Sequence, residues 1–171
     1  MPRLFFALWP DESVRDSLYA VARAAHQSSG GRLMRRDNLH QTLVFIGNVA
    51  AERRTEIETA ATAIDAKSFK LDFGTTGYWK HNRIIWAAPL ATPDALTNLV
   101  AALEAGLAQA GIDFDSRPYS PHVTLVRDAR VRGSLPAMQF NWPLHDFVLV
   151  ESGHDSGGVA YRVVARWPLV F

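Results

Sequence analysis

The sequence contains no cysteine among its 171 residues. This absence excludes disulfide bonds, cysteine zinc sites, iron–sulfur clusters and thiol catalysis. No apolar run approaches the roughly 18 residues of a membrane-spanning helix, and the N-terminal stretch up to Trp9 lacks the segments of a signal peptide. We therefore expect a cytoplasmic protein that does not act at a membrane.

Two common catalytic signatures are also missing. There is no Gly-x-Ser-x-Gly segment, which argues against a Ser-His-Asp triad, and no Gly-rich loop that ends in Lys-Ser or Lys-Thr. The sequence therefore favours neither a serine hydrolase nor an ATP-dependent mechanism.

The composition is that of a globular protein with a modest net charge. Hydrophobic residues make up 48% of the chain, charged residues 20%, and the formal net charge is +1. This length suits one domain over residues 1–171 or two tightly joined half-domains, and a monomer is the simplest state. Of the 18 basic residues 15 are arginine. The guanidinium group matches phosphate oxygens well, although a GC-rich genome explains the same bias.

The hydrophobic pattern predicts alternating strands and helices. Asp11 is suited to cap a helix whose apolar stripe runs from Val14 to Ala25, and Gly111 follows a second striped helix that opens at Pro93. Further helix is expected at 51–66. Strands are expected at 3–9, 39–46, 69–73, over part of 78–86, and at 122–127, 146–150 and 161–167, with a hairpin turn near Asn82. This order predicts an α+β fold with an antiparallel sheet.

The most informative feature is a tetrapeptide that occurs twice. His-x-Thr-Leu begins at His40 and again at His122, 82 residues later. Random placement of these residue types gives about 0.03 matches in such a chain, so a second match by chance is improbable. The spacing, nearly half the chain, suggests a duplicated, two-lobed architecture with a central cleft.

Strand geometry predicts what the two motifs present. Residues i and i+2 of a strand point to the same face, so His40 shares a face with Thr42, and His122 shares one with Thr124. If the lobes face each other, two imidazoles and two hydroxyls meet in one cleft.

This set of groups suits the hydrolysis of a cyclic phosphodiester. One histidine takes a proton from water while the other protonates the leaving oxygen, which a side chain with a pKa near 6.5 can do at neutral pH. Threonine hydroxyls can donate to the phosphate oxygens, where negative charge builds in the transition state. A strained five-membered cyclic phosphate needs less electrophilic help than an unstrained diester, so no metal is required.

Two other interpretations of the histidines remain open at this point. Both can be core residues bonded to neighbouring groups. A catalytic zinc site is the other, but it needs three protein ligands, and neither motif contains a third histidine or an adjacent carboxylate.

The whole pattern resembles the two-histidine (2H) phosphoesterase superfamily, and within it the LigT-like RNA 2′,3′-cyclic phosphodiesterases, historically called 2′-5′ RNA ligases. The resemblance covers nearly the whole chain. It rests on five segments, the two motif regions 37–47 and 121–127 and the strands at 3–10, 83–86 and 161–169. One departure is Gln41, where the family more often has an apolar residue. By strand alternation we expect Gln41 to face away from the cleft.

The resemblance implies a fold and a mechanism. The fold is a single domain over residues 1–171 made of two interleaved antiparallel-sheet lobes, a bilobal α+β structure. A pseudo-twofold axis relates the lobes, the helices lie outside and the active-site cleft lies between the lobes. No cofactor is implied. The substrate is RNA with a 2′,3′-cyclic phosphate end, hydrolysed to a 2′-phosphate, and the reverse reaction joins ends through a 2′-5′ bond. His40 is the proton donor and His122 the proton acceptor.

Several other residues are secondary candidates. Arg127 lies five residues after His122, so on a regular strand its side chain points to the opposite face. It reaches the phosphate only if the strand bends after Leu125. Phe45 is a candidate base-stacking platform or a core residue, and Arg35 and Arg36 are RNA contacts or solvated charges. Tyr78, Trp79 and His81 are RNA contacts or hairpin packing. His26, His145 and His154 are expected to be structural or to lie at the surface.

Two alternative functions remain open from the sequence. One is a phosphodiesterase for a small nucleotide, either a cyclic phosphate or a 2′-5′ oligonucleotide. The other is an RNA-binding module that retains the fold without catalysis, against which the two intact motifs argue.

Overall fold

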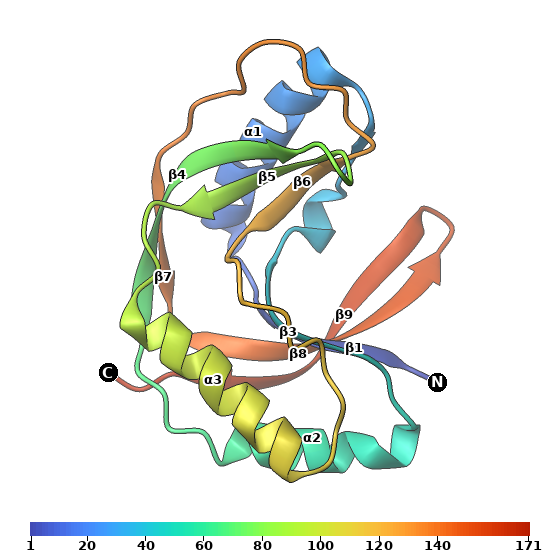
Figure 1. The fold of residues 1–171 in the computed structure, drawn as a ribbon, viewed down its shortest axis with the longest axis vertical. Coiled ribbons are helices and arrows are strands. Elements are labelled where there is room, and N and C mark those ends of the chain that lie inside the picture. The colour runs from blue at the N-terminus through green and yellow to red at the C-terminus, as the bar shows by residue number, and fades with distance from the viewer.

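A computed structural model describes all residues, 1–171. It contains three α-helices, two short 3-10 helices and nine strands (Figure 1). In chain order these are β1 (Arg3–Leu8), α1 (Glu12–Ser29), β2 (Arg32–Leu33), η1 (Arg36–Asn38), β3 (Gln41–Asn48), η2 (Ala51–Arg53), α2 (Arg54–Thr62), β4 (Phe69–Trp79), β5 (Ile84–Pro89), α3 (Asp94–Gln109), β6 (Val123–Arg127), β7 (Phe140–Leu144), β8 (Asp146–Asp155) and β9 (Gly158–Pro168).

The strands form one antiparallel sheet made of two halves. Its order is β7-β4-β5-β6-β3-β1-β8-β9, and β2 pairs with β6 away from this path. The halves meet where β3 runs beside β6, and there a single residue pair, Gln41 with Val123, joins them. These are the middle residues of the two repeated tetrapeptides, so the junction lies at the expected pseudo-twofold axis.

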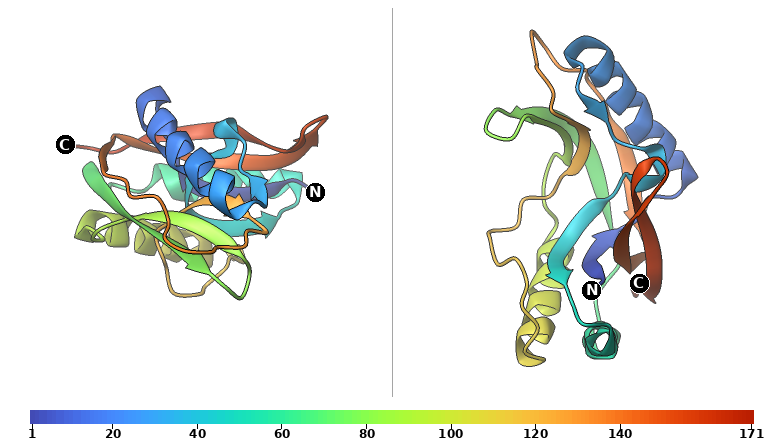
Figure 2. Two further views of the ribbon diagram at one scale, coloured as in Figure 1. Left: turned by 90° about the horizontal axis from the view of Figure 1, so that it is seen from above. Right: turned by 90° about the vertical axis from the view of Figure 1, so that its right-hand side faces the viewer.

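The helices connect the halves in an interleaved way. α1 follows β1 of one half but packs against β6 of the other, and α3 follows β5 but packs against β3. In Figure 1, α1 lies behind β4, β5 and β6, whereas α2 and α3 lie together at the opposite end of the molecule. The right-hand view of Figure 2 shows the same separation from the side. Helices therefore cover the outer face of each half of the sheet.

Most buried apolar side chains belong to one core of 34 residues between the sheet and the helices. A second, smaller cluster, Phe5, Ala7, Val148 and Val150, lies on the other face of β1 and β8. β1 is therefore buried on both faces, which explains why its sequence is a continuous apolar run rather than an alternating one.

The α1 and α3 predictions are confirmed, including the cap in which the Asp11 carboxylate accepts from the Val14 amide at 2.9 Å. The predicted helix at 51–66 is shorter than expected, because it opens with the 3-10 turn η2 and ends at Thr62. The hairpin around Asn82 is also confirmed, with longer strands than predicted. β7 was missed because Pro143 lies within it. Proline is tolerated there because β7 is an edge strand, paired only with β4.

Candidate active site

The single pair at the junction brings the two motifs together. Gln41 and Val123 oppose each other, so the residues that flank them are neighbours. Thr42 and Thr124 lie within β3 and β6, and His40 and His122 immediately precede these strands. All four side chains line one cavity of about 460 Å³. The motif residues that the sequence predicts to share a cleft therefore do so in the structure.

Both imidazoles are held in the same way through Nδ1. In His40 this atom lies 2.7 Å from the Asn38 carbonyl oxygen, and in His122 it lies 2.8 Å from the Ser120 carbonyl oxygen, two residues earlier in each case. A carbonyl oxygen can only accept, so Nδ1 carries the proton and Nε2 of the neutral ring has a free lone pair. In His40 that lone pair accepts from the Thr42 hydroxyl at 2.9 Å.

His40 lies in a tight aromatic environment. The Phe5 ring is 4.9 Å from its imidazole, the Trp9 indole is stacked on it at 5.6 Å, and the Tyr161 ring meets it edge-on at 5.2 Å. This burial lowers the pKa of His40 to about 4. The Asn38 carbonyl opposes the shift, and the positive charges of His122, Arg127 and Arg15 add to it.

His122 is less enclosed. Its one aromatic neighbour is Trp79, whose ring meets the imidazole edge-on at 4.7 Å. Burial again lowers the pKa of His122, the Ser120 carbonyl opposes the shift, and the charge of Arg127 adds to it. Both rings are therefore neutral at pH 7 when no ligand is present.

Arg127 reaches the cleft because β6 contains a bulge. Trp86 pairs with Thr124 and Ile85 with Val126, so Leu125 is an extra residue on β6. The bulge shifts the alternation by one residue and places Arg127 along the same cavity wall as His122 and Thr124. This is the bend on which the prediction for Arg127 depended.

Like Arg3 on the wall of the same cavity, Arg127 has a guanidinium without an acidic partner. Its neighbours Arg32 and Arg83 are paired with Asp128, at 2.9 and 3.6 Å. Its positive charge lowers the pKa of both His40 and His122, so it lies close to both.

A second cavity of about 430 Å³ adjoins the first. The two share the wall formed by Thr42, Phe45, His122, Thr124 and Arg127. Beyond His122 the second cavity continues to the β4–β5 hairpin, where Trp79, His81 and Asn82 line it. The cleft therefore has two arms that meet at the histidine pair.

Gln41 faces away from the cleft, as expected. It is fully buried, and its amide donates to the Tyr119 hydroxyl at 3.1 Å, which in turn donates to the Thr42 carbonyl at 3.0 Å. Gln41 and Tyr119 together therefore fix the backbone of the first motif from behind.

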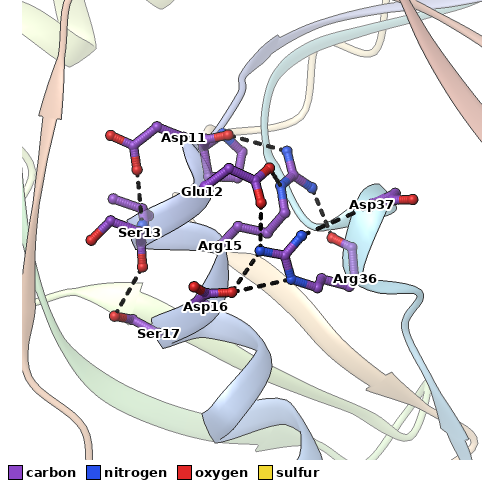
Figure 3. Close-up of polar contacts among 10 residues, drawn as sticks. Asp11, Glu12, Ser13, Arg15, Asp16, Ser17, Arg36 and Asp37 are labelled. Carbon is purple, nitrogen blue, oxygen red and sulfur yellow. Dashed lines mark hydrogen bonds and ion pairs between the residues drawn. The ribbon is translucent and has the colours of Figure 1, made fainter.

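Two of the other arginine candidates are committed to ion pairs. Arg36 binds Glu12 and Asp16 on α1, at 2.7 and 2.6 Å (Figure 3), and Arg35 binds Asp155 at 2.9 Å. Both therefore hold neighbouring segments in place.

The aromatic and histidine candidates divide between the cleft and the scaffold. Phe45, Trp79 and His81 line the cleft, whereas the Tyr78 hydroxyl donates to the Ala129 carbonyl at 2.7 Å, so Tyr78 is structural. His26 bonds to the Gly31 carbonyl oxygen at 3.1 Å and His145 lies beside Phe171. His154, expected to be structural or at the surface, is exposed and also lines the first cavity.

Four contributors to the site escaped the sequence analysis: Trp9, Arg15, Asn38 and Tyr161. Trp9 had a signal, since it lies four residues after Phe5 and therefore on the same face of the extended chain. Nothing in the sequence connects the other three with His40.

The structure contains neither a candidate metal-binding cluster nor a helix that could span a membrane. Nowhere do three or more His, Asp or Glu side chains gather in a way that could hold a metal ion. None of the helices combines the length and the apolar character that crossing a membrane requires.

Comparison with known proteins gives consistent results. The family model described as LigT like Phosphoesterase matches residues 8–86 and 88–161. The RNA 2′,3′-cyclic phosphodiesterase of Escherichia coli is 32% identical over 169 residues, which cover 98% of this chain and 96% of that protein. The protein of the same name from Thermus thermophilus is 26% identical over 180 residues, covering 98% and 90%.

The fold is shared with solved structures as well. The crystal structure of E. coli LigT complexed with 3′-AMP superposes with a TM-score of 0.90 at 31% identity and covers 99% of both chains. The expected two-lobed α+β fold is therefore confirmed.

Proposed function

The chain belongs to the LigT-like phosphoesterase family, and on this basis we propose that it hydrolyses 2′,3′-cyclic phosphate ends of RNA to 2′-phosphates. One observation carries the proposal. Two imidazoles, each with Nδ1 bonded to a backbone carbonyl, face one cavity that also contains the unpaired guanidinium of Arg127.

In this mechanism His122 is the base and His40 the acid. His122 Nε2 takes a proton from water, the water oxygen attacks phosphorus, and the P–O3′ bond breaks as His40 delivers a proton from Nε2 to O3′. The product is a 2′-phosphate and a free 3′-hydroxyl, and the two histidines have exchanged protonation states. The free lone pair of His122 and its more open setting suit a base that must reach water.

Thr42, Thr124 and Arg127 hold the phosphate in this scheme. Their side chains line both arms of the cleft beside the two histidines, where they can donate to the non-bridging oxygens. The Thr42 hydroxyl, which points to His40 Nε2 in the free protein, turns to the phosphate and leaves that nitrogen to carry the proton. Donors that are already in place stabilise the charge that develops in the transition state.

The required partner is an RNA with a cyclic phosphate end, and we propose that a monomer acts on it in the cytoplasm. Every side chain assigned to the reaction comes from one chain, so the site needs no second copy.

The direct test is product analysis. The purified protein, incubated with an oligoribonucleotide that ends in a 2′,3′-cyclic phosphate, should release only the 2′-phosphate, which resists a phosphatase specific for 3′-phosphates. EDTA should leave the rate unchanged. Loss of activity in EDTA and its return with zinc would contradict the mechanism, and a marked preference for a cyclic mononucleotide would favour the small-nucleotide alternative.

The lowered pKa values predict a difference between two pH profiles. In the free protein burial keeps both imidazoles neutral, with the pKa of His40 at about 4. A bound phosphate monoanion favours the protonated rings and so raises both pKa values. We expect the optimum of kcat, which reports the enzyme–substrate complex, to lie about one pH unit or more above that of kcat/KM, which reports the free enzyme.

Steady-state rates between pH 4 and 9 at constant ionic strength measure both profiles. Coincident optima would show that the substrate does not change the protonation of the pair.

A further inference from the structure

His40 is at one end of a stacked column that His122 lacks. Its imidazole and the Trp9 indole are stacked, with ring centres 5.6 Å apart and planes inclined by 22°. On the same indole, the guanidinium carbon of Arg15 lies 5.5 Å from the ring centre. Trp9 therefore contacts both the His40 imidazole and the Arg15 guanidinium, and we refer to these three groups as the column.

Arg15 is itself held rigidly. It lies in the first turn of α1, where its side chain is almost fully buried and its guanidinium donates to the Pro10 carbonyl at 3.1 Å and to the Arg36 carbonyl at 2.7 Å (Figure 3). The exposed Glu12 lies 4.0 Å away, and Glu12 and Asp37 are the acidic groups whose charge favours the protonated guanidinium. A buried charge that forms no closer ion pair is costly to the fold.

The second bond of Arg15 leads to His40 by another route. The Arg36 carbonyl opens the 3-10 turn η1, which ends at Asn38. The backbone carbonyl of Asn38 accepts from Nδ1 of His40, and the side-chain amide of Asn38 donates to the Val159 carbonyl at 2.8 Å. One guanidinium thus supports both the face of the His40 ring, through Trp9, and the bond that sets its tautomer, through η1.

We propose that Arg15 and Trp9 are positioning residues that hold His40 in the orientation and protonation behaviour of the acid, a role absent from the otherwise matching His122. The inference rests on the proposed function. The positive charge of Arg15 lowers the pKa of His40 and so makes a protonated His40 a stronger acid toward the leaving oxygen. His122 has only the edge of Trp79 beside it, and Arg15 is not among the groups that shift its pKa.

Other charged or titratable groups also face His40, and the test must separate them from Arg15. They are His122 and Arg127 across the cleft, and Arg3, Arg32, His154 and Tyr161 around the first cavity.

The decisive variants are Arg15→Met and Trp9→Leu, each with a conservative partner, Arg15→Lys and Trp9→Phe. We expect Arg15→Met and Trp9→Leu to lower kcat on the order of tenfold with KM little changed, because a misplaced acid affects the transition state more than binding. The NMR titration midpoint of His40 should rise in Arg15→Met and that of His122 should stay. Arg15→Lys should restore the midpoint, and Trp9→Phe should restore most of kcat.

Arg36→Ala is the matched control. It removes the exposed ion pairs between η1 and α1 but keeps the carbonyl that Arg15 binds, so kcat and the His40 midpoint should not move. A folded Arg15→Met protein with an unchanged His40 midpoint and unchanged kcat would overturn the inference. If Arg15→Met does not fold, an unchanged kcat in Trp9→Leu overturns it. The titration tests the column even if the wild-type protein fails to hydrolyse RNA ends, an outcome that would refute the proposed function alone.

Discussion

Replacing either histidine of the pair with alanine should reduce kcat/KM on a 2′,3′-cyclic phosphate by about 10²- to 10⁴-fold, the usual contribution of a positioned acid or base. In the proposed mechanism, His122→Ala removes the group that takes the proton from water, and His40→Ala removes the one that protonates O3′. Because the two act in one step, the double variant should be little worse than either single variant. Initial rates with a labelled oligoribonucleotide measure all three.

The control for this pair is His26→Ala. His26 lies in the last turn of α1 and bonds to the Gly31 carbonyl, away from both arms of the cleft, so its loss should leave kcat/KM unchanged. Circular dichroism and thermal unfolding should show that every variant keeps the fold. Hydrolysis at the wild-type rate by either single variant would refute the two-histidine mechanism.

A change of leaving group assigns the roles. A cyclic phosphate with sulfur in place of O3′ releases a thiolate, which needs no proton from the enzyme. This substrate should restore much of the activity of His40→Ala and none of that of His122→Ala. The reverse pattern would exchange the assignment of acid and base.

The local features of the fold could be predicted from the sequence where one interaction dominates. The Asp11 cap and the apolar stripes of α1 and α3 are local patterns, and the structure reproduces them. The two-residue strand β2 and the edge strand β7 depend on partners far away in the chain, β6 and β4, which no local pattern reveals. The long β8–β9 hairpin exceeded its predicted length because pairing between the strands, rather than burial, extends it to Asp155 and Gly158.

The candidate site divides in the same way. Strand alternation was sufficient to place His40, Thr42, His122 and Thr124 on one cleft, because each motif is a local extended segment. Arg127 required a bulge at Leu125, which only the pairing of β6 with β5 defines. The column behind His40 joins β1, α1 and η1, and such a three-way contact leaves no periodic signal in the sequence.

Arg127→Met should have the second largest effect, a loss of about 10²- to 10³-fold in kcat/KM, comparable to that of removing one donor from an oxyanion site. The guanidinium has no acidic partner in the protein and lies beside both histidines, so its charge and its donors are available to a phosphate. Arg127→Lys should restore only part of the activity, because an ammonium group cannot form the two parallel bonds of a guanidinium. Inhibition by inorganic phosphate should weaken in parallel.

Substitution of the neighbouring Arg32 tests whether the loss of kcat/KM is specific to Arg127 or follows from any loss of positive charge in the cleft. Arg32 lines the same cavity but is paired with Asp128, so Arg32→Met should change kcat/KM far less. Removing the charge of Arg127 should also raise the pKa of both histidines, which NMR titration can follow. Since Arg127 has no ion pair to lose, its removal should not lower the unfolding temperature. Equal losses from Arg127→Met and Arg32→Met would mean that the cleft attracts phosphate through its overall charge, and the specific role of Arg127 would then be wrong.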